Sequence, residues 1–258
     1  MGPGRRSQIK ESYIMKKLSF SVFACIVACT TFAKGFSYDE ENIDHPVTPF
    51  SFSLATPLQL PTSSWNVYGL ALNVFYAQHH VMYGLDAGLT SFNRDDAAGV
   101  LLQGVANWSN SDVYGLQIAG LANAVMGNTA GLQLASVANY NRGDFYGGQV
   151  SLINHNGMIN GFQAGVFNYN KGVCKALQIG AANADVNEYR GCSIGAVNYA
   201  GRFRGLQIGL INEIVETGRG VQIGVFNGAV NYSGLQIGLF NVISKGSLPI
   251  MVVMNAQF

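Results

Sequence analysis

Hydrophobic and polar residues alternate along this chain in short blocks that return about every fifteen residues. In the block GLQIGLIN at 205–212, apolar residues occupy the second, fourth and sixth positions, and Gly or Gln occupies the first, third and fifth. Successive side chains of a β-strand point to opposite faces, so this alternation predicts a strand with one apolar and one polar face, whereas helical spacing would mix the two. We therefore expect an all-β protein.

The same block recurs along most of the chain. Near copies begin at residues 115, 131, 147, 161, 176, 191, 205, 220 and 234, and weaker copies lie at 84–93, 99–107 and 246–255. The blocks close on asparagines that are 14 to 16 residues apart, most clearly Asn107, Asn123, Asn139, Asn154, Asn168, Asn183, Asn198, Asn212, Asn227 and Asn241. Helical repeats have units of about 33 to 47 residues, so this short period indicates one strand and one turn per unit.

The segments between the blocks carry turn residues. YNRG at 140–143 and YNKG at 169–172 place Asn before Gly, and HNG at 155–157 contains Asn-Gly, the dipeptide most typical of short hairpins. Such turns reverse the chain, so antiparallel neighbours are expected. Together with segments 47–58 and 65–76 and the final apolar segment, the repeats predict about 14 short strands, an even number that suits an up-and-down barrel.

Two architectures fit this pattern. In an up-and-down antiparallel β-barrel, Leu and Ile would face lipid while Gly and Gln face the lumen, and the terminal Phe258 would resemble the assembly signal of bacterial outer-membrane barrels. In the alternative, a β-solenoid, Leu and Ile would stack inside and the asparagines would form a ladder. The barrel is preferred, although three apolar positions span only about 14 Å of the roughly 25 Å that a membrane band needs.

The N-terminal segment predicts export. Lys16 and Lys17 precede an apolar run and small residues, so we interpret residues 15–33 as a signal peptide and residues 1–14 as an upstream mis-start. Cleavage after Ala33 is one alternative. The other is lipidation at Cys29, because Ile-Val-Ala-Cys at 26–29 looks like a lipobox. Residues 34–46 form a polar linker, and residues 47–258 are expected to be a single β-repeat domain.

The repeats resemble those of a bacterial family of surface-repeat proteins. The resemblance covers residues 48–258 and is carried by the GLQIGLxN units, by TPLQLPTSSWNVYGLALNVFY before them, and by the barrel-like end SLPIMVVMNAQF. It implies an exported protein of the cell envelope or surface, with lipoproteins among the members and no established biochemical activity. This chain departs from the repeat consensus at Ala176, Cys192 and Ser193.

Composition narrows the function further. Only 11% of residues are charged and the formal net charge is +1, which argues against nucleic acid as a partner and is compatible with a membrane. The pairs His79-His80 with Asp86, and Asp95-Asp96, could be taken for metal or acid–base clusters, but they fall near expected turns. No catalytic residue, metal site or cofactor is therefore expected.

Two sets of polar residues recur with the repeat. Arg190, Arg202, Arg204 and Arg219 precede strand starts and could form a rim that attracts anions such as lipid phosphates, or they could be scattered solvated charges. The glutamines at the third position could line a pore or form a hydrogen-bonded ladder. Cys174 and Cys192 are expected to be structural thiols.

The sequence thus predicts a non-enzymatic outer-membrane or cell-surface repeat protein, either a small pore or a structural envelope barrel. The alternative is a lipidated or secreted β-solenoid that serves adhesion or binding. The repeat pattern itself names no ligand.

Overall fold

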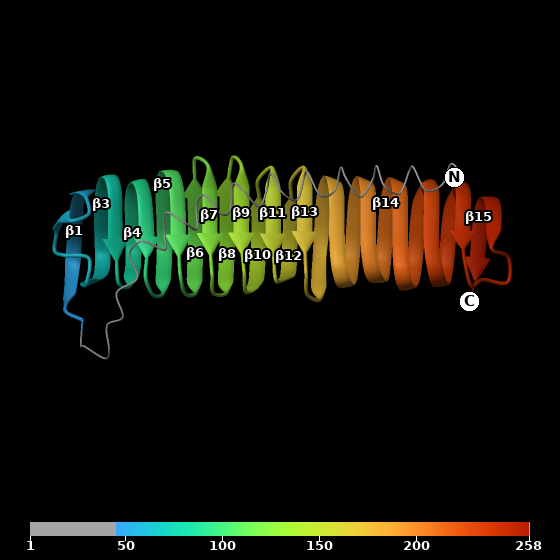
Figure 1. Ribbon diagram of the computed structural model, residues 1–258, viewed down its shortest axis with the longest axis horizontal. Coiled ribbons are helices and arrows are strands. Elements are labelled where there is room, and N and C mark those ends of the chain that lie inside the picture. The colour runs from blue at the N-terminus through green and yellow to red at the C-terminus, as the bar shows by residue number, and fades with distance from the viewer. Residues whose placement is uncertain (1–44, 258) are drawn as a thin grey trace, which may run out of the picture. The chain divides into compact units, whose positions relative to one another are not determined.

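The computed structural model describes residues 45–257, and all the regular secondary structure in that range is β (Figure 1). The signal peptide, Cys29, most of the linker and Phe258 lie outside the described residues. The strands are β1 (Val47–Ala55), β2 (Leu58–Leu60), β3 (Asn66–His79), β4 (Met82–Asn93), β5 (Ala97–Ser109), β6 (Val113–Ala119), β7 (Ala122–Val125), β8 (Thr129–Ala135), β9 (Ala138–Asn141), β10 (Asp144–Val150), β11 (Ile153–Asn156), β12 (Met158–Ala164), β13 (Phe167–Asn170), β14 (Cys174–Ile243) and β15 (Ile250–Gln257).

Each repeat forms one coil of a β-solenoid. In the coil that begins at Gly115, β6 and β7 are two arcs of the same turn, and each pairs in parallel with the equivalent arc of the next coil. The register is strict, since Gln117 pairs with Gln133 and Asn123 with Asn139. Figure 1 shows the coils following one another along one axis, and the long strand β14 runs through several of them without a break.

The predicted all-β repeat fold is confirmed, whereas the predicted antiparallel barrel is wrong and the alternative, the solenoid, is correct. The error came from the turns after the asparagines. They continue the coil in the same sense instead of reversing it, and equivalent turns stack on each other: the amide of Gly143 donates to the carbonyl of Gly127, and that of Gly157 to the carbonyl of Asn141, both at 3.2 Å. A period of fifteen residues is therefore a complete coil of two arcs.

The glycine that opens each coil is required by its backbone. Gly147 has a φ of 135°, a region that L-residues rarely adopt, and a Cβ there would overlap the carbonyl oxygen of Gly131 in the preceding coil. Equivalent glycines in the other coils share both properties. Ala176 is the exception: it pairs in register with Gly161 but its φ is not positive.

The Asn and Gln side chains of the repeat lie inside the solenoid, and its Leu, Ile and Val side chains lie outside. The Gln at the third position and the Asn that closes each block are buried, with Gln149 and Asn154 both 0% exposed, whereas Ile179 is 42% and Leu210 is 59% exposed. This reverses the solenoid predicted from sequence, which placed Leu and Ile inside. In-register stacking explains the reversal, because it holds identical amides about 4.8 Å apart, where they can satisfy one another.

The two ends of the stack differ from its middle. At the C-terminal end β15 pairs antiparallel with β14, and at the N-terminal end β2 pairs antiparallel with β1. Irregular terminal units of this kind are typical of solenoids, whose unpaired end coils would otherwise template aggregation.

Candidate functional site

A continuous ladder of asparagine side chains runs through the interior. The Nδ2 of Asn168 donates to the Oδ1 of Asn183 at 2.7 Å and to the backbone carbonyl of Ile179 at 3.1 Å, while its Oδ1 accepts from Asn154 at 2.9 Å. The same side-chain bonds join the asparagines from Asn107 to Asn241, each to the next. We call this the Asn ladder. Because its asparagines repeat the same side-chain bond, the Asn ladder indicates a structural role and not a catalytic one.

A second interior column consists of the residues two positions after each asparagine of the Asn ladder. Its residue types differ between the middle coils and the C-terminal coils of the solenoid. In the middle coils the column contains asparagines that bond across the core to the buried glutamines; Asn141, for example, donates to Gln133 at 2.8 Å. In the C-terminal coils the equivalent positions are apolar, and they pack with buried aromatic rings. That apolar set is Ala200, Ile214, Ala229 and Ile243 with Tyr189, Phe203 and Tyr232.

Asp185 occupies the second column where the two regions meet. Its carboxyl accepts from Asn170 at 2.9 Å and from Gln178 at 3.2 Å, and burial raises its pKa to about 7. The Oε1 of Gln178 has no hydrogen-bond partner. Burial and the neighbouring Asp185 also raise the pKa of the Cys174 thiol, so this thiol stays protonated, as a structural role predicts.

His79 and Asp86, which the sequence singled out, do come together. The Nε2 of His79 lies 3.9 Å from the Oδ2 of Asp86, and the hydroxyl of Ser91 donates to the same carboxyl. Burial lowers the pKa of His79 and raises that of Asp86, and all three residues are 0% exposed. The residue types match a Ser-His-Asp set, but an enclosed cluster offers no access to a substrate.

The other candidate clusters separate in the structure. The ring of His80 lies against that of His45, with centroids 3.6 Å apart and ring planes inclined by 43°. Asp96 accepts from the hydroxyl of Ser111 at 2.6 Å and from the amide of Asp112 at 3.1 Å, so it bridges turns of successive coils. Among residues 45–257, no group of three or more metal-ligating side chains is assembled.

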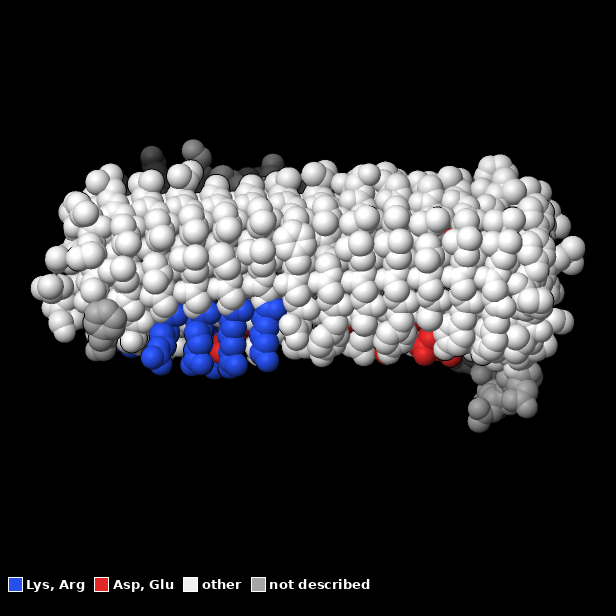
Figure 2. Space-filling model, turned by 180° about the vertical axis from the view of Figure 1, so that it is seen from behind, with Lys and Arg blue, Asp and Glu red and all other residues white. Residues whose placement is uncertain are grey.

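The outer surface carries a broad uncharged face. Between the residue that opens a coil and the asparagine that closes it, from Gly84 to Asn241, Asp86 is the only charged residue, and it is buried. Exposed Leu, Ile and Val side chains occupy these positions in coil after coil. We call this surface the apolar face. On the side of the molecule seen in Figure 2, nearly all the charged side chains lie along one edge.

A row of cations borders the apolar face. Lys175, Arg190, Arg204 and Arg219 each stand one position before the residue that opens a coil, and all four are exposed. Figure 2 shows cationic side chains lined up along this edge. The four residues are called the cation row. The sequence identified its three arginines but missed Lys175, which precedes the exceptional Ala176.

The cation row is only partly neutralised. Arg190 forms an ion pair with Glu188 at 2.6 Å, which lowers the pKa of that carboxyl. Arg202, predicted to belong to the same rim, lies two residues before Arg204 and faces Glu188 and Glu216 at 3.9 and 3.8 Å. In the described part of the chain no carboxylate pairs with Lys175, Arg204 or Arg219. Three cations are therefore available to an external anion.

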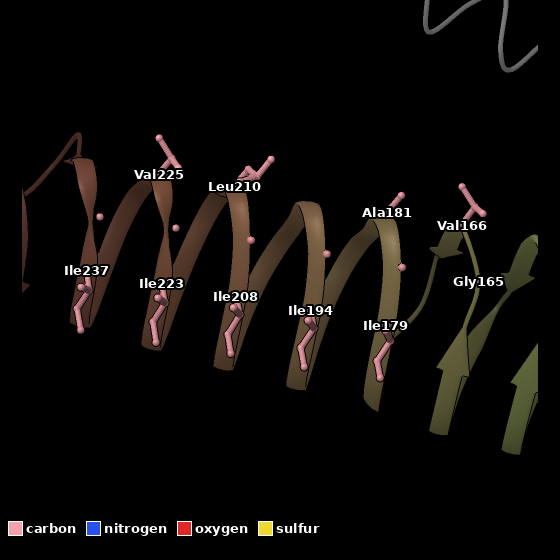
Figure 3. A pocket seen from close by; sticks show the side chains of 15 residues that line it. Gly165, Val166, Ile179, Ala181, Ile194, Ile208, Leu210, Ile223, Val225 and Ile237 are labelled. Carbon is pink, nitrogen blue, oxygen red and sulfur yellow. The ribbon is translucent and has the colours of Figure 1, made fainter.

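An open groove of about 710 Å³ runs along the apolar face. Its floor is a column of glycines, from Gly165 to Gly238, and its walls are Ile side chains on one side and Val, Ala and Leu on the other (Figure 3). The Asn ladder explains the glycines: a Cβ on Gly195 would lie 2.5 Å from the carbonyl oxygen of Gly180 and 2.9 Å from the Nδ2 of Asn183. The interior ladder thus requires these glycines, and their backbone forms the floor of the groove between the two rows of outward side chains.

Comparisons with protein-family models, with curated proteins and with solved structures found no match. The site must therefore be interpreted from its own chemistry.

No helix within residues 45–257 is long and apolar enough to cross a membrane.

Proposed function

We propose that the protein is an exported, non-enzymatic β-solenoid of the bacterial cell surface or envelope that uses its apolar face for binding. The observation that carries this proposal is the placement of the repeat residues, in which hydrogen-bonded Asn and Gln side chains line the interior and the Leu, Ile and Val side chains of the repeat cover one outer face. For a purely structural role, the hydrogen-bonded interior would be enough. The exposed face therefore supports a role in contact with another surface.

The extent of the apolar face supports a binding role. Soluble monomers rarely expose contiguous apolar patches larger than a few hundred Å². Here large apolar side chains that are more than a third exposed recur from Leu72 in the N-terminal coils to Leu239 in the last full coil. Leaving such a face in water is costly, since each Å² of apolar surface contributes about 25 cal/mol when it is buried. Burial of the apolar face against a partner would therefore stabilise the complex.

Export rests on the sequence. Residues 15–33 have the charge and apolar run of a signal peptide, and Cys29 stands at the end of a lipobox. An acyl chain at Cys29 would tether the solenoid to a membrane and bring its apolar face close to the envelope.

Location can be tested by expressing the full chain in a bacterium that has an outer membrane. We expect the wild-type protein in the envelope fraction, trimmed at its N-terminus, and accessible to protease added outside the cells or after opening of the outer membrane. Deletion of residues 15–33 is the control and should leave the protein in the cytosol. An untrimmed wild-type chain that stays in the cytosol would contradict the proposal.

Binding by the apolar face can be tested separately. Exchanging the exposed Ile194 and Ile223 for Thr keeps a β-favouring shape but makes the groove wall polar. We expect this variant to fold as the wild type does and to bind less of a hydrophobic dye or an apolar resin. The matched control exchanges the exposed Val186 and Val215, which lie outside the apolar face, for Thr.

A further inference from the structure

We propose that the apolar face docks on a lipid bilayer that contains anionic phospholipid, with the cation row contacting the lipid phosphates. This inference rests on the proposed function, because it names the partner of the face proposed there to bind. It goes further by assigning a selective role to Lys175, Arg190, Arg204 and Arg219.

The cations and the apolar side chains belong to one flat surface. In the coil that opens at Ala176, Lys175, Leu177 and Ile179 alternate outward on the same strand, and all three are exposed, while Gln178 between the last two is buried. The next coils repeat this alternation with an exposed arginine in place of Lys175 and with partly or fully exposed apolar residues after it, apart from Cys192 in the coil that opens at Gly191. Residues two apart on a strand are about 7 Å apart, so the charges lie directly beside the apolar columns.

The arrangement of the charges fits a lipid headgroup layer. Successive coils place the cations about 4.8 Å apart, which concentrates positive charge along a line at the border of the apolar face. Proteins that lie on membranes bury an apolar face at the headgroup boundary while Lys and Arg contact anionic lipids. Lys175, Arg204 and Arg219 form no ion pair within the described chain, so phosphate would not have to displace a carboxylate from them.

Aromatic residues flank the apolar face on both edges. In the coils before the cation row, the same column contains the tyrosines Tyr68, Tyr83, Tyr114 and Tyr146, which are 39–49% exposed. At the opposite edge, Tyr140, His155 and Tyr169 stack on one another with ring centroids 4.8 and 5.3 Å apart. Tyr side chains are enriched where proteins meet the boundary between lipid and water. Tyrosines and cations therefore share one column, and each borders the apolar face with a residue type that is found at the boundary between lipid and water.

A second copy of the chain fits this surface less well. The column of the cation row contains no acidic residue in any coil from Tyr68 to Ser233, so a partner copy offers no carboxylate at the matching position. The nearest acidic residues in the coils before the cation row, Asp96, Asp112 and Asp144, lie two positions further back, and Asp96 and Asp112 bind the turns of neighbouring coils. A polyanion without apolar groups would use the cations but leave the apolar face exposed.

The test is co-sedimentation of the purified full chain with vesicles. One set contains phosphatidylcholine alone, and the other contains phosphatidylcholine with phosphatidylglycerol; each is measured at low and at high salt. The N-terminal segment is the same in every variant, so differences between variants report on the solenoid. We expect wild type to bind the anionic vesicles more tightly, and high salt to reduce this preference.

The decisive variant removes the three unpaired cations, Lys175→Gln, Arg204→Gln and Arg219→Gln. Its matched control removes three exposed cations elsewhere, Arg142→Gln, Lys171→Gln and Lys245→Gln, with the same loss of net charge. Each cation at an anionic surface contributes roughly 1 kcal/mol, so the first variant should bind anionic vesicles about a hundredfold more weakly, and the control much less. The variant Ile194→Thr with Ile223→Thr should lose binding to both kinds of vesicle.

Other results would overturn the inference in distinguishable ways. Equal losses in the two charge variants would mean that only net charge matters. Equal binding of wild type to both kinds of vesicle would leave an apolar binding face and the proposed function intact but remove the role of the cation row. Absence of vesicle binding, together with dimers that disappear in the Ile variant, would assign the face to a second copy. Retention of wild type in the cytosol, by contrast, would refute the proposed function itself.

Discussion

The middle and C-terminal coils share a backbone but fill their interiors differently. Both contain the Asn ladder, yet beside it the middle coils place a second asparagine column against the glutamines, as in the pair Gln163 and Asn170, and the C-terminal coils place aliphatic and aromatic side chains. One repeat therefore supports both an amide core and an apolar core. Every coil of this fold requires the Asn ladder and nearly every coil its opening glycine. The residues of the second column can change between polar and apolar types, provided that the side chains packed against them change in the same way.

The largest expected effect concerns the apolar core of the C-terminal coils. Phe203 is 3% exposed and stacks on Tyr189 with ring centroids 5.9 Å apart. Phe203→Ala should lower the free energy of unfolding by about 4 kcal/mol, because it leaves a cavity that the stacked coils cannot collapse into. Urea denaturation measures this. A loss below about 1 kcal/mol would mean that the C-terminal coils do not depend on their apolar core.

The Asn ladder should matter equally in both regions. Asn168 lies in the middle coils and Asn212 in the C-terminal coils, and each accepts one side-chain bond and donates two bonds. Replacing either by Ala leaves buried polar groups without partners, so each variant should lose about 3 kcal/mol. Unfolding curves of the two variants should superimpose. A much smaller loss for Asn212→Ala would show that the apolar core replaces the ladder there.

The boundary between the two regions should be improved by Asp185→Asn. The new amide would donate to the unpartnered Oε1 of Gln178, as Asn170 donates to Gln163, and would remove a buried carboxyl. We expect a gain of about 2 kcal/mol at pH 8, measured by thermal unfolding. Exchange of the exposed Asp95 for Asn is the control and should change little.

The gain should depend on pH. The pKa of Asp185 rises from 3.8 to about 7 on folding, so the folded state retains a proton that the unfolded state loses. The contribution of this group to stability is therefore complete below about pH 4 and declines as the pH rises toward 7. The advantage of Asn over Asp should grow over the same range. An advantage that is the same at pH 4 and pH 8 would show that Asp185 does not titrate there.

The smallest effect concerns Ala176, which opens the boundary coil. Ala176→Gly restores the consensus, but because φ is not positive at this position Gly brings only extra freedom to the unfolded chain. The variant should be less stable by about 0.5–1 kcal/mol. A gain in stability would instead indicate that the alanine is strained. Calorimetry on the two proteins, with the binding surface unchanged, distinguishes these results.

Period-two alternation predicted the strands and their two faces, but it could not predict strand direction. Parallel coils and antiparallel hairpins share the same alternation, and the turn residues at 140–143 and 155–157, which place Asn before Gly, favour hairpins in isolation. Stacking decided the outcome, since only parallel coils bring Asn139 in register with Asn154. The inside of the solenoid was misassigned for the same reason: buried amides are costly singly and become stable only when each has an identical neighbour.

The candidate site was predictable in part. The arginines of the cation row were visible from their fixed place before each strand, whereas Lys175 was hidden because the residue after it is Ala rather than Gly. The sequence offered His79 and Asp86 as a possible cluster but favoured turn positions for them, whereas the structure brings the two side chains together and buries them. An alternating pattern does not show that a coil is closed over its polar side.

Because equivalent residues of successive coils pair in register, the number of coils sets the length of the solenoid. Every interface between coils in the middle region is nearly the same, so adding or deleting a unit of 14 to 16 residues changes the length of the stack by about 4.8 Å while every remaining side chain keeps its partner. Duplication of one unit in the gene is then a conservative change. The length of the solenoid and the number of contacts along its surface can therefore change by one coil at a time, while the packing of the core stays the same.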